Sequence, residues 1–235
     1  MLPMTMKRSF PIFAAVTAIL LCYALYMALI GAPTEKTMGD VQRIFYYHVP
    51  SAWTAFLLFF INFGASVFYL VRRNPAADIV ALVSAEVGVV FCTVVLITGP
   101  IWARPVWGIW WTWDMRLTST LVLWLIYVSY LFLRRFSSGG QTPLMAASLA
   151  VLGALCVPFV YFSIWFFRTQ HPQPVMGGGG SIDPRMLRVL LLNWLAFLCF
   201  AFMLCRSRYR VEKLQREVDE AHAMRSLHEP RGSVR

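Results

Sequence analysis

The sequence has 235 residues, of which 59% are hydrophobic and only 14% are charged, with a formal net charge of +10. A water-soluble domain carries about a quarter charged residues, so this composition excludes an ordinary soluble protein and indicates a membrane protein. The five cysteines lie in or at the end of apolar stretches and none pairs as C-x-x-C, which argues against thiol redox chemistry and a cysteine-ligated metal.

Six stretches are long and apolar enough to cross a bilayer as helices, which takes about 20 residues. They comprise residues 10–30, 53–71, 79–99, 117–133, 144–167 and 187–205. The first lacks the flanks and the small-residue cleavage site of a signal peptide, so it is expected to be retained. The predicted fold class is therefore an all-α integral membrane protein with six transmembrane helices.

The distribution of Lys and Arg predicts the orientation of these spans, because cytoplasmic loops carry the excess of positive charge. With the N-terminus in the cytoplasm, the inner segments hold 14 Lys and Arg residues and the outer segments hold 7. Both termini are therefore predicted to be cytoplasmic. The net positive charge follows from this topology, so no nucleic-acid partner is expected.

This topology divides the chain into a six-span membrane domain, residues 1–205, and a cytoplasmic tail, residues 206–235. The tail mixes basic and acidic residues, which is typical of a solvated helix with a frayed end. Glu86 lies in the middle of the third span, where an acidic residue is either functional or bonded to a neighbouring helix. Both interpretations of Glu86 stay open at this point.

The outer loops cover residues 32–52, 100–116 and 168–186, and the second is rich in tryptophan. Residues 105–118 read PVWGIWWTWDMRLT and, with Trp102, place five of the nine tryptophans of the chain in one stretch. Pro105 is suited to start a short helix at the membrane interface. Such a helix over 105–114 would put four residues on one face. These are Trp107, Trp110, Trp111 and Asp114.

An aromatic belt at the headgroup level is the simplest interpretation of interfacial tryptophans. A belt, however, needs no glycine for close approach and no charges on the segment that bears the rings. Here Gly108, Asp114 and Arg116 are interleaved with the tryptophans. This combination favours a site for a flat, largely apolar and partly anionic ligand. The third outer loop carries GGGG at 177–180, which indicates a flexible linker.

Two of the four histidines, His48 and His171, lie on outer loops at the depth of this segment, whereas His222 and His228 belong to the tail. Neutral imidazoles that approach from two sides suit the axial positions of a haem iron. A guanidinium fork suits the carboxylates of the two haem propionates. The candidates for this pairing are Arg43, Arg104 and Arg116.

WGIWWTWDMRLTS resembles the tryptophan-rich WWD signature of membrane proteins that handle haem in cytochrome c biogenesis. Within that superfamily, the length, the six spans and the two outer histidines are similar to the haem exporter protein C (CcmC) family of the cytochrome c maturation system. The resemblance runs from about residue 43 to residue 205, and RIFYYHVPSAW and SIDPRM support it.

The resemblance implies a protein of the bacterial inner membrane that binds haem b non-covalently on its periplasmic face. It implies His48 and His171 as axial ligands and the WWD segment as the haem platform. The matching platform positions are Trp107, Gly108, Trp111, Trp113, Asp114 and Arg116. Trp110 and Arg43 are further candidates for binding the haem. The implied partners are a periplasmic haem chaperone, the subunits of an ATP-binding cassette transporter, a small membrane subunit and the surrounding membrane lipid.

The chain departs from the family pattern before the second histidine. Many relatives carry a tryptophan pair where this sequence has Phe166 and Phe167, and Gln170 replaces a common leucine. The loop around His171 is therefore expected to hold haem in a different way.

Two other functions are compatible with six apolar spans. A transporter that moves haem or another solute through its own helix bundle is the main alternative. An electron-transfer cytochrome of the b type would place histidine pairs inside the spans, and none lies there. No hydrolytic motif and no phosphate-binding loop is present, so the chain is not expected to be an enzyme.

Overall fold

The computed structural model describes residues 4–137, 139–172 and 182–228, and these residues are almost entirely helical. Six α-helices carry the fold: α1 (Met4–Tyr26), α2 (Phe45–Arg72), α3 (Pro75–Trp107), α4 (Met115–Phe136), α5 (Thr142–Phe166) and α6 (Pro184–His228). A π-helical turn, η1 (Met27–Gly31), extends α1, and a 3-10 turn, η2 (Asp40–Ile44), leads into α2. All six α-helices contain stretches long and apolar enough to cross a membrane, which confirms the predicted fold class.

Local capping explains where the central helices begin and end. The side chain of Asn74 accepts hydrogen bonds from the N–H groups of Ala76 and Ala77, and Pro75 occupies the first turn of α3. Arg73 adopts the left-handed conformation that ends α2, with φ of 53°. The turn between α2 and α3 is therefore only two residues long, and the two helices form an antiparallel hairpin.

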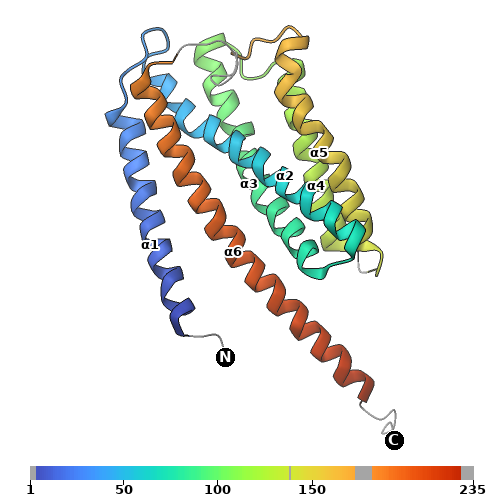
Figure 1. Cartoon of the computed structure of the whole chain (residues 1–235). Helices are drawn as coiled ribbons and strands as arrows, with labels where there is room; N and C mark the ends of the chain where they lie inside the picture. The colour runs from blue at the N-terminus through green and yellow to red at the C-terminus, as the bar shows by residue number, and fades with distance from the viewer. Residues whose placement is uncertain (1–3, 138, 173–181, 229–235) are drawn as a thin grey trace, which may run out of the picture.

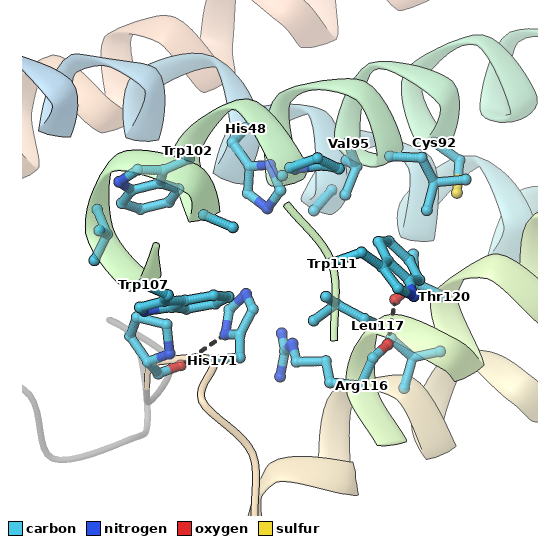
Figure 2. A pocket seen from close by; sticks show the side chains of 18 of the residues that line it. His48, Cys92, Val95, Trp102, Trp107, Trp111, Arg116, Leu117, Thr120 and His171 are labelled. Atoms are coloured by element: carbon cyan, nitrogen blue, oxygen red, sulfur yellow. Dashed lines mark hydrogen bonds between the residues drawn. The ribbon is translucent and has the colours of Figure 1, made fainter. Parts of the chain in front are cut away.

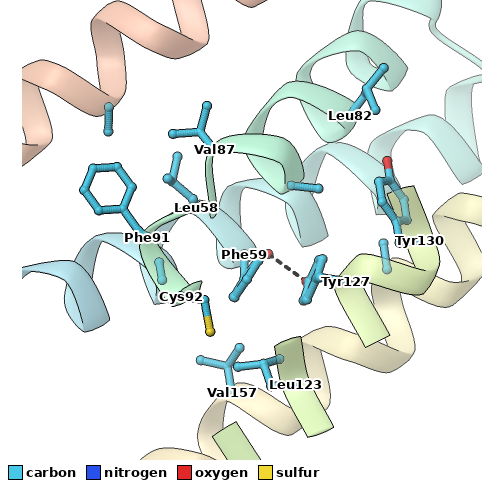
Figure 3. Packing of buried hydrophobic residues seen from close by; sticks show 14 of the residues in the cluster. Leu58, Phe59, Leu82, Val87, Phe91, Cys92, Leu123, Tyr127, Tyr130 and Val157 are labelled. Carbon is cyan, nitrogen blue, oxygen red and sulfur yellow. Dashed lines mark hydrogen bonds between the residues drawn. The ribbon is translucent and has the colours of Figure 1, made fainter. Parts of the chain in front are cut away.

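This hairpin lies at the centre of the bundle (Figure 1). Helices α4 and α5 pack together on one side of it, and α6 crosses it on the other side with α1 outside. The rings of Phe59 and Tyr127 stack with centroids 3.8 Å apart in the largest hydrophobic cluster (Figure 3). Gly88 permits this packing, because a Cβ there would lie 2.8 Å from the Phe59 ring.

The start of α1 and the end of α6 lie at the same end of the bundle, here called the terminal end (Figure 1). The opposite end, called the site end, carries the connections between α1 and α2, between α3 and α4, and between α5 and α6. Helix α6 has 45 residues, which makes it about 68 Å long at about 1.5 Å per residue. It therefore extends beyond a hydrocarbon core of about 30 Å and runs without a break across residue 205.

Ion pairs attach this extended part of α6 to the bundle. Arg208 donates two hydrogen bonds of 2.8 Å to the carboxylate of Glu86, so the mid-span acid bonds a neighbouring helix. Closer to the terminal end, the buried carboxylate of Asp78 accepts hydrogen bonds from Arg134 of α4 and from Arg216 of α6. The helical part of the predicted tail is thus partly bound to the bundle, and the GGGG segment lies outside the described residues.

Candidate functional site

The tryptophan-rich segment is not one helix over 105–114, which corrects the helical interpretation of its pattern. Helix α3 continues through Pro100 and Pro105 and ends at Trp107. Gly108 then adopts the left-handed conformation, with φ of 80°, and its N–H bonds the carbonyl of Arg104 at 3.0 Å. Asp114 is the N-cap of α4, so the next helix begins at Met115. The residues between the end of α3 and this cap are not helical. The tryptophans therefore lie partly at the end of α3 and partly in the turn between α3 and α4.

A cavity lies at the site end, between α2, α3, the start of α4 and the loop that follows α5 (Figure 2). It contains about 920 Å³ of space between the protein atoms, including its open mouth, and its lining is mostly apolar. Its chemically distinctive lining residues are His48, Trp102, Trp107, Trp111, Arg116 and His171. Residues from four separate parts of the chain thus meet in one hollow.

His48 reaches the cavity from the first turns of α2 and is 8% exposed. Its Nδ1 lies 2.9 Å from the hydroxyl oxygen of Thr98 on α3. That hydroxyl donates its proton to the carbonyl of Val94 at 2.7 Å, so its oxygen must accept from the Nδ1–H of His48. The bond selects one tautomer and leaves Nε2 with a free lone pair on the cavity side.

His171 is oriented in the same way from the other side of the cavity. Its Nδ1 lies 2.9 Å from the carbonyl oxygen of Pro172, which can only accept, so Nδ1 carries the proton. Burial and the positive charge of Arg116 lower the pKa of His171 to about 4. The imidazole is therefore neutral at pH 7, and its Nε2 is available as a ligand.

The two imidazoles point into the cavity from opposite walls, as Figure 2 shows. Trp102 packs against His48 edge-on, with ring centroids 5.8 Å apart. The indole N–H groups of Trp102 and Trp111 are buried and have no hydrogen-bond partner among the described residues. Buried polar groups are normally satisfied, so these two donors are available to bond acceptor atoms of a ligand or of water.

Arg116, in the first turn of α4, is the cationic side chain of the lining. Its Nη1 donates a long hydrogen bond of 3.4 Å to the carbonyl of Tyr161, and no carboxylate of the described residues forms an ion pair with it. A partly buried guanidinium without an anionic partner is suited to pair with a carboxylate of a ligand.

The remaining predicted platform residues do not line the cavity. Gly108, Trp110 and Trp113 lie in the turn beside it, and Trp113 is 76% exposed. Arg43 lies in η2, where it donates to the carbonyl of Ala28 in η1 at 3.0 Å and pairs with the carboxylate of Asp40. The structure thus gives Arg43 a role in holding α1 to α2.

Asp114 is also outside the lining, but it supports His171. Its Oδ1 caps α4 by accepting from the N–H of Leu117 at 2.9 Å, and its Oδ2 accepts from the hydroxyl of Thr169 at 2.8 Å. The Thr169 oxygen in turn accepts from the backbone N–H of His171 at 3.1 Å. This chain of bonds joins the tryptophan-rich segment to the loop that carries the second histidine.

Thr98 and Thr169 are the supporting residues that sequence reasoning missed. Each bonds a partner far away in the chain: Thr98 lies 50 positions from His48, and Thr169 lies 55 positions from Asp114. Thr98 lies inside α3, where a hydroxyl usually bonds the preceding turn of its own helix, and Thr169 lies in the loop after α5. Neither threonine therefore carries a local signal of its distant bond.

The cavity fits haem better than a bare metal ion. Among the described residues, no group of three or more His, Cys, Asp or Glu side chains could hold a metal. Two neutral imidazoles on opposite walls instead match an ion whose four equatorial ligands come from a macrocycle. The indole donors and the guanidinium match its carboxylates.

Replacing Thr98 with valine is expected to weaken haem binding by roughly 10- to 100-fold, the usual effect of removing the partner of a metal-bound histidine. The shape of the side chain is kept, but the Nδ1–H of His48 loses its acceptor. Haem titration followed by the Soret absorbance measures the effect. Thr93→Val is the matched control, because Thr93 lies on the same helix and its hydroxyl bonds Trp124 rather than a histidine. Equal affinities of the two variants would contradict the role of Thr98.

Comparison with known proteins adds an independent line of evidence. The family model described as "Heme exporter protein C" matches residues 2–224. A heme exporter protein C of Bradyrhizobium diazoefficiens is 36% identical over 222 residues, which cover 93% of this chain and 84% of that protein. The heme exporter protein C of Escherichia coli strain K12 is 33% identical over 180 residues, or 76% of this chain and 73% of the relative. A putative ccmC-like mitochondrial protein for cytochrome c biosynthesis from Marchantia polymorpha is 33% identical over 175 residues, or 74% and 75% of the two chains.

Proposed function

Because the chain belongs to the heme exporter protein C family, we propose that it binds haem b non-covalently in the cavity at the site end and delivers it to a periplasmic haem chaperone. The observation that carries this proposal is the pair of imidazoles, His48 and His171. Their Nδ1 atoms are both anchored, and both side chains point into one cavity. The delivery serves the maturation of c-type cytochromes, together with transporter subunits and a small membrane subunit.

In this proposal, haem would supply the iron, and the imidazoles of His48 and His171 would hold it. His48 approaches from a rigid helix, and His171 approaches from the loop tied to Asp114. Trp102, Trp107 and Trp111 exclude water from the cavity and cover the macrocycle. The chain performs no covalent chemistry: it orients the haem, and the chaperone provides any nucleophile.

The loop position of His171 suits release. A histidine held by α2 and Thr98 keeps its place, whereas one carried by the loop after α5 can move away when a chaperone approaches. The exposed Trp110 and Trp113 lie beside this loop, in the turn between α3 and α4. We assign these two tryptophans to the surface that meets the chaperone or the lipid.

We further propose that the site end faces the periplasm and the terminal end the cytoplasm, as the Lys and Arg distribution predicts. A green fluorescent protein fused after residue 235 should then fluoresce in cells, because it folds only in the cytoplasm. An alkaline phosphatase fused within residues 32–39 should be active, because it needs the periplasm. The reverse pattern would contradict this orientation and the proposed route to a periplasmic chaperone.

Arg116→Gln is expected to weaken binding of haem by about 10-fold, since it removes a charge-assisted bond to a propionate. Binding of haem dimethyl ester, in which both carboxylates are blocked, should be the same in the variant and the native protein. Titration of both proteins with both ligands gives a thermodynamic cycle that isolates the contact between Arg116 and a haem propionate. Arg168→Gln, an exposed arginine on the same loop as His171, is the control. A loss of similar size with the ester would show that Arg116 acts on the fold rather than on the propionate.

Transport of a solute through the helix bundle finds no supporting observation among the described residues. Asn62 of α2 donates to the carbonyl of Ala81 of α3 at 2.7 Å, Asn193 of α6 donates to the carbonyl of Ala24 of α1 at 3.3 Å, and Glu86 of α3 is paired with Arg208 of α6. These three side chains thus bond neighbouring helices rather than line a path. Movement of haem across vesicles that contain only this chain would favour transport over delivery.

A further inference from the structure

A second hollow lies toward the terminal end, as a groove between α2, α3 and α6. It contains about 2090 Å³ of space between the protein atoms, including its open side, and its wall is mostly apolar. The wall residues include Leu57, Ile61, Val80, Val83 and Phe202. Apolar residues at the surface of a membrane protein face lipid chains, so the lining of this groove suits hydrocarbon.

The mouth of the groove is basic. Arg206, Arg210 and Lys213 line it at intervals of four and three residues, which places them on one face of α6. From Leu198 in the apolar part to Arg210 at the mouth is about 18 Å at about 1.5 Å per residue. That length matches one leaflet, which is half of a hydrocarbon core of about 30 Å.

The arginines at this mouth have no acidic partner. Arg208 and Arg216, on another face of α6, pair with Glu86 and Asp78. Within the described residues, neither Arg206 nor Arg210 forms an ion pair, and both lie over the ring of Phe10, at 5.7 and 5.5 Å from its centroid.

Further donors at the groove lack a partner. The Nε atom of Arg206 and the hydroxyl of Thr54 are buried and have no hydrogen bond in the described part of the chain. Lys213 reaches only Glu217, at 3.8 Å and with both side chains more than half exposed. The mouth therefore places the positive charges of Arg206 and Arg210, which have no acidic partner among the described residues, next to the apolar wall of the groove.

We propose that this groove is a binding site for one anionic phospholipid of the leaflet at the terminal end. Its acyl chains lie along the apolar wall, and its phosphate contacts Arg206, Arg210 and Lys213. Glu217 also lines the groove and lies near Lys213, but Arg206 and Arg210 have no acidic partner in the described part of the chain, so a lipid with a net negative charge is favoured over a zwitterionic one. Haem also combines an apolar body with carboxylates, but no histidine lines this groove.

Native mass spectrometry of the purified full-length chain in detergent tests the proposal. The protein is titrated with phosphatidylglycerol and, separately, with phosphatidylcholine that carries the same acyl chains. We expect one retained phosphatidylglycerol per chain, with at least a 10-fold preference over phosphatidylcholine. The variant R206Q/R210Q/K213Q should lose this preference. The matched control is R72Q/R73Q/R135Q, which removes three exposed arginines from the same end of the bundle but outside the groove, and it should keep the preference.

The variant R206K/R210K separates charge from folding, because it retains both cations and should retain the preference. Haem titration of R206Q/R210Q/K213Q should match that of the native protein, since the haem cavity lies at the opposite end. Equal retention of the two lipids by the native protein would overturn the proposal. An unchanged lipid preference in R206Q/R210Q/K213Q would also overturn it. The same holds if these three substitutions weaken haem binding but leave lipid binding unchanged.

Discussion

Replacing either His48 or His171 with alanine is expected to convert bound haem from a six-coordinate, low-spin form to a five-coordinate, high-spin form. In the proposed site each imidazole would supply one axial ligand, and no other His of the described residues lines the cavity. The affinity should fall by more than the roughly 10- to 100-fold that loss of a supporting residue causes. Visible absorption and electron paramagnetic resonance of the purified protein report the ligation, and haem titration reports the affinity.

The two single variants should differ in their response to added imidazole. His171 is carried by the loop after α5 rather than by a helix, so free imidazole should enter the space left in His171→Ala and restore the low-spin spectrum. His48 is 8% exposed and lies behind Trp102, so rescue of His48→Ala should need a higher concentration. His222→Ala, an exposed residue of α6, is the control and should leave both the spectrum and the affinity unchanged. Unaltered spectra in both His48→Ala and His171→Ala would show that the axial ligands lie elsewhere.

Asp78→Ala is expected to cause the largest loss of stability, about 3–5 kcal/mol in the free energy of unfolding. Asp78 is 3% exposed and accepts hydrogen bonds of 2.8 Å from both Arg134 and Arg216. Its removal leaves two guanidinium groups close together, and the Arg134 side chain is only 9% exposed. The loss is costly because Arg134 keeps a buried charge without a counter-ion among the described residues, whereas Arg216 keeps its ion pair with Glu212 at 2.9 Å.

Unfolding of the purified protein by sodium dodecyl sulfate in mixed micelles, followed by circular dichroism, measures this loss. Asp219→Ala is the matched control: it removes an exposed carboxylate from the same end of the molecule and should change stability by less than about 0.5 kcal/mol. Haem binding by folded Asp78→Ala should remain native-like, because the ion cluster and the haem cavity lie at opposite ends. Equal stability of the two variants would mean that the cluster does not hold α6 to the bundle.

The pattern of apolar residues in the sequence predicts the six membrane-spanning helices well, for a simple physical reason. A helix that crosses hydrocarbon must satisfy its own backbone and present apolar side chains, and both requirements are local. Four of the six predicted spans therefore lie inside single observed α-helices, whereas the first runs from α1 into η1 and the fifth ends one residue beyond α5. Several of the helices are longer than the predicted spans. Helix α3, for example, runs eight residues beyond the predicted end of the third span, through Pro100 and Pro105 to Trp107.

The tryptophan-rich segment shows where a local pattern is insufficient. Its spacing is compatible with a helix over 105–114, but Gly108 can adopt a positive φ and Asp114 can cap the next helix. The preference of Gly108 to end α3 and that of Asp114 to start α4 are together stronger than the amphipathic spacing of the tryptophans. As a result Trp107 and Trp111 line the cavity, while Trp110 and Trp113 do not.

The sequence by itself determined the class of the protein, its six spans, the family resemblance and the choice of His48 and His171 as a pair. Composition, apolar length and motif are properties of neighbouring residues, so they can be read without a fold. Only the tertiary structure decided that Thr98 holds His48, that Asp114 supports the loop of His171, and that Glu86 pairs with Arg208. Each of these bonds joins residues 50 or more positions apart, and such partners become neighbours only when the helices pack.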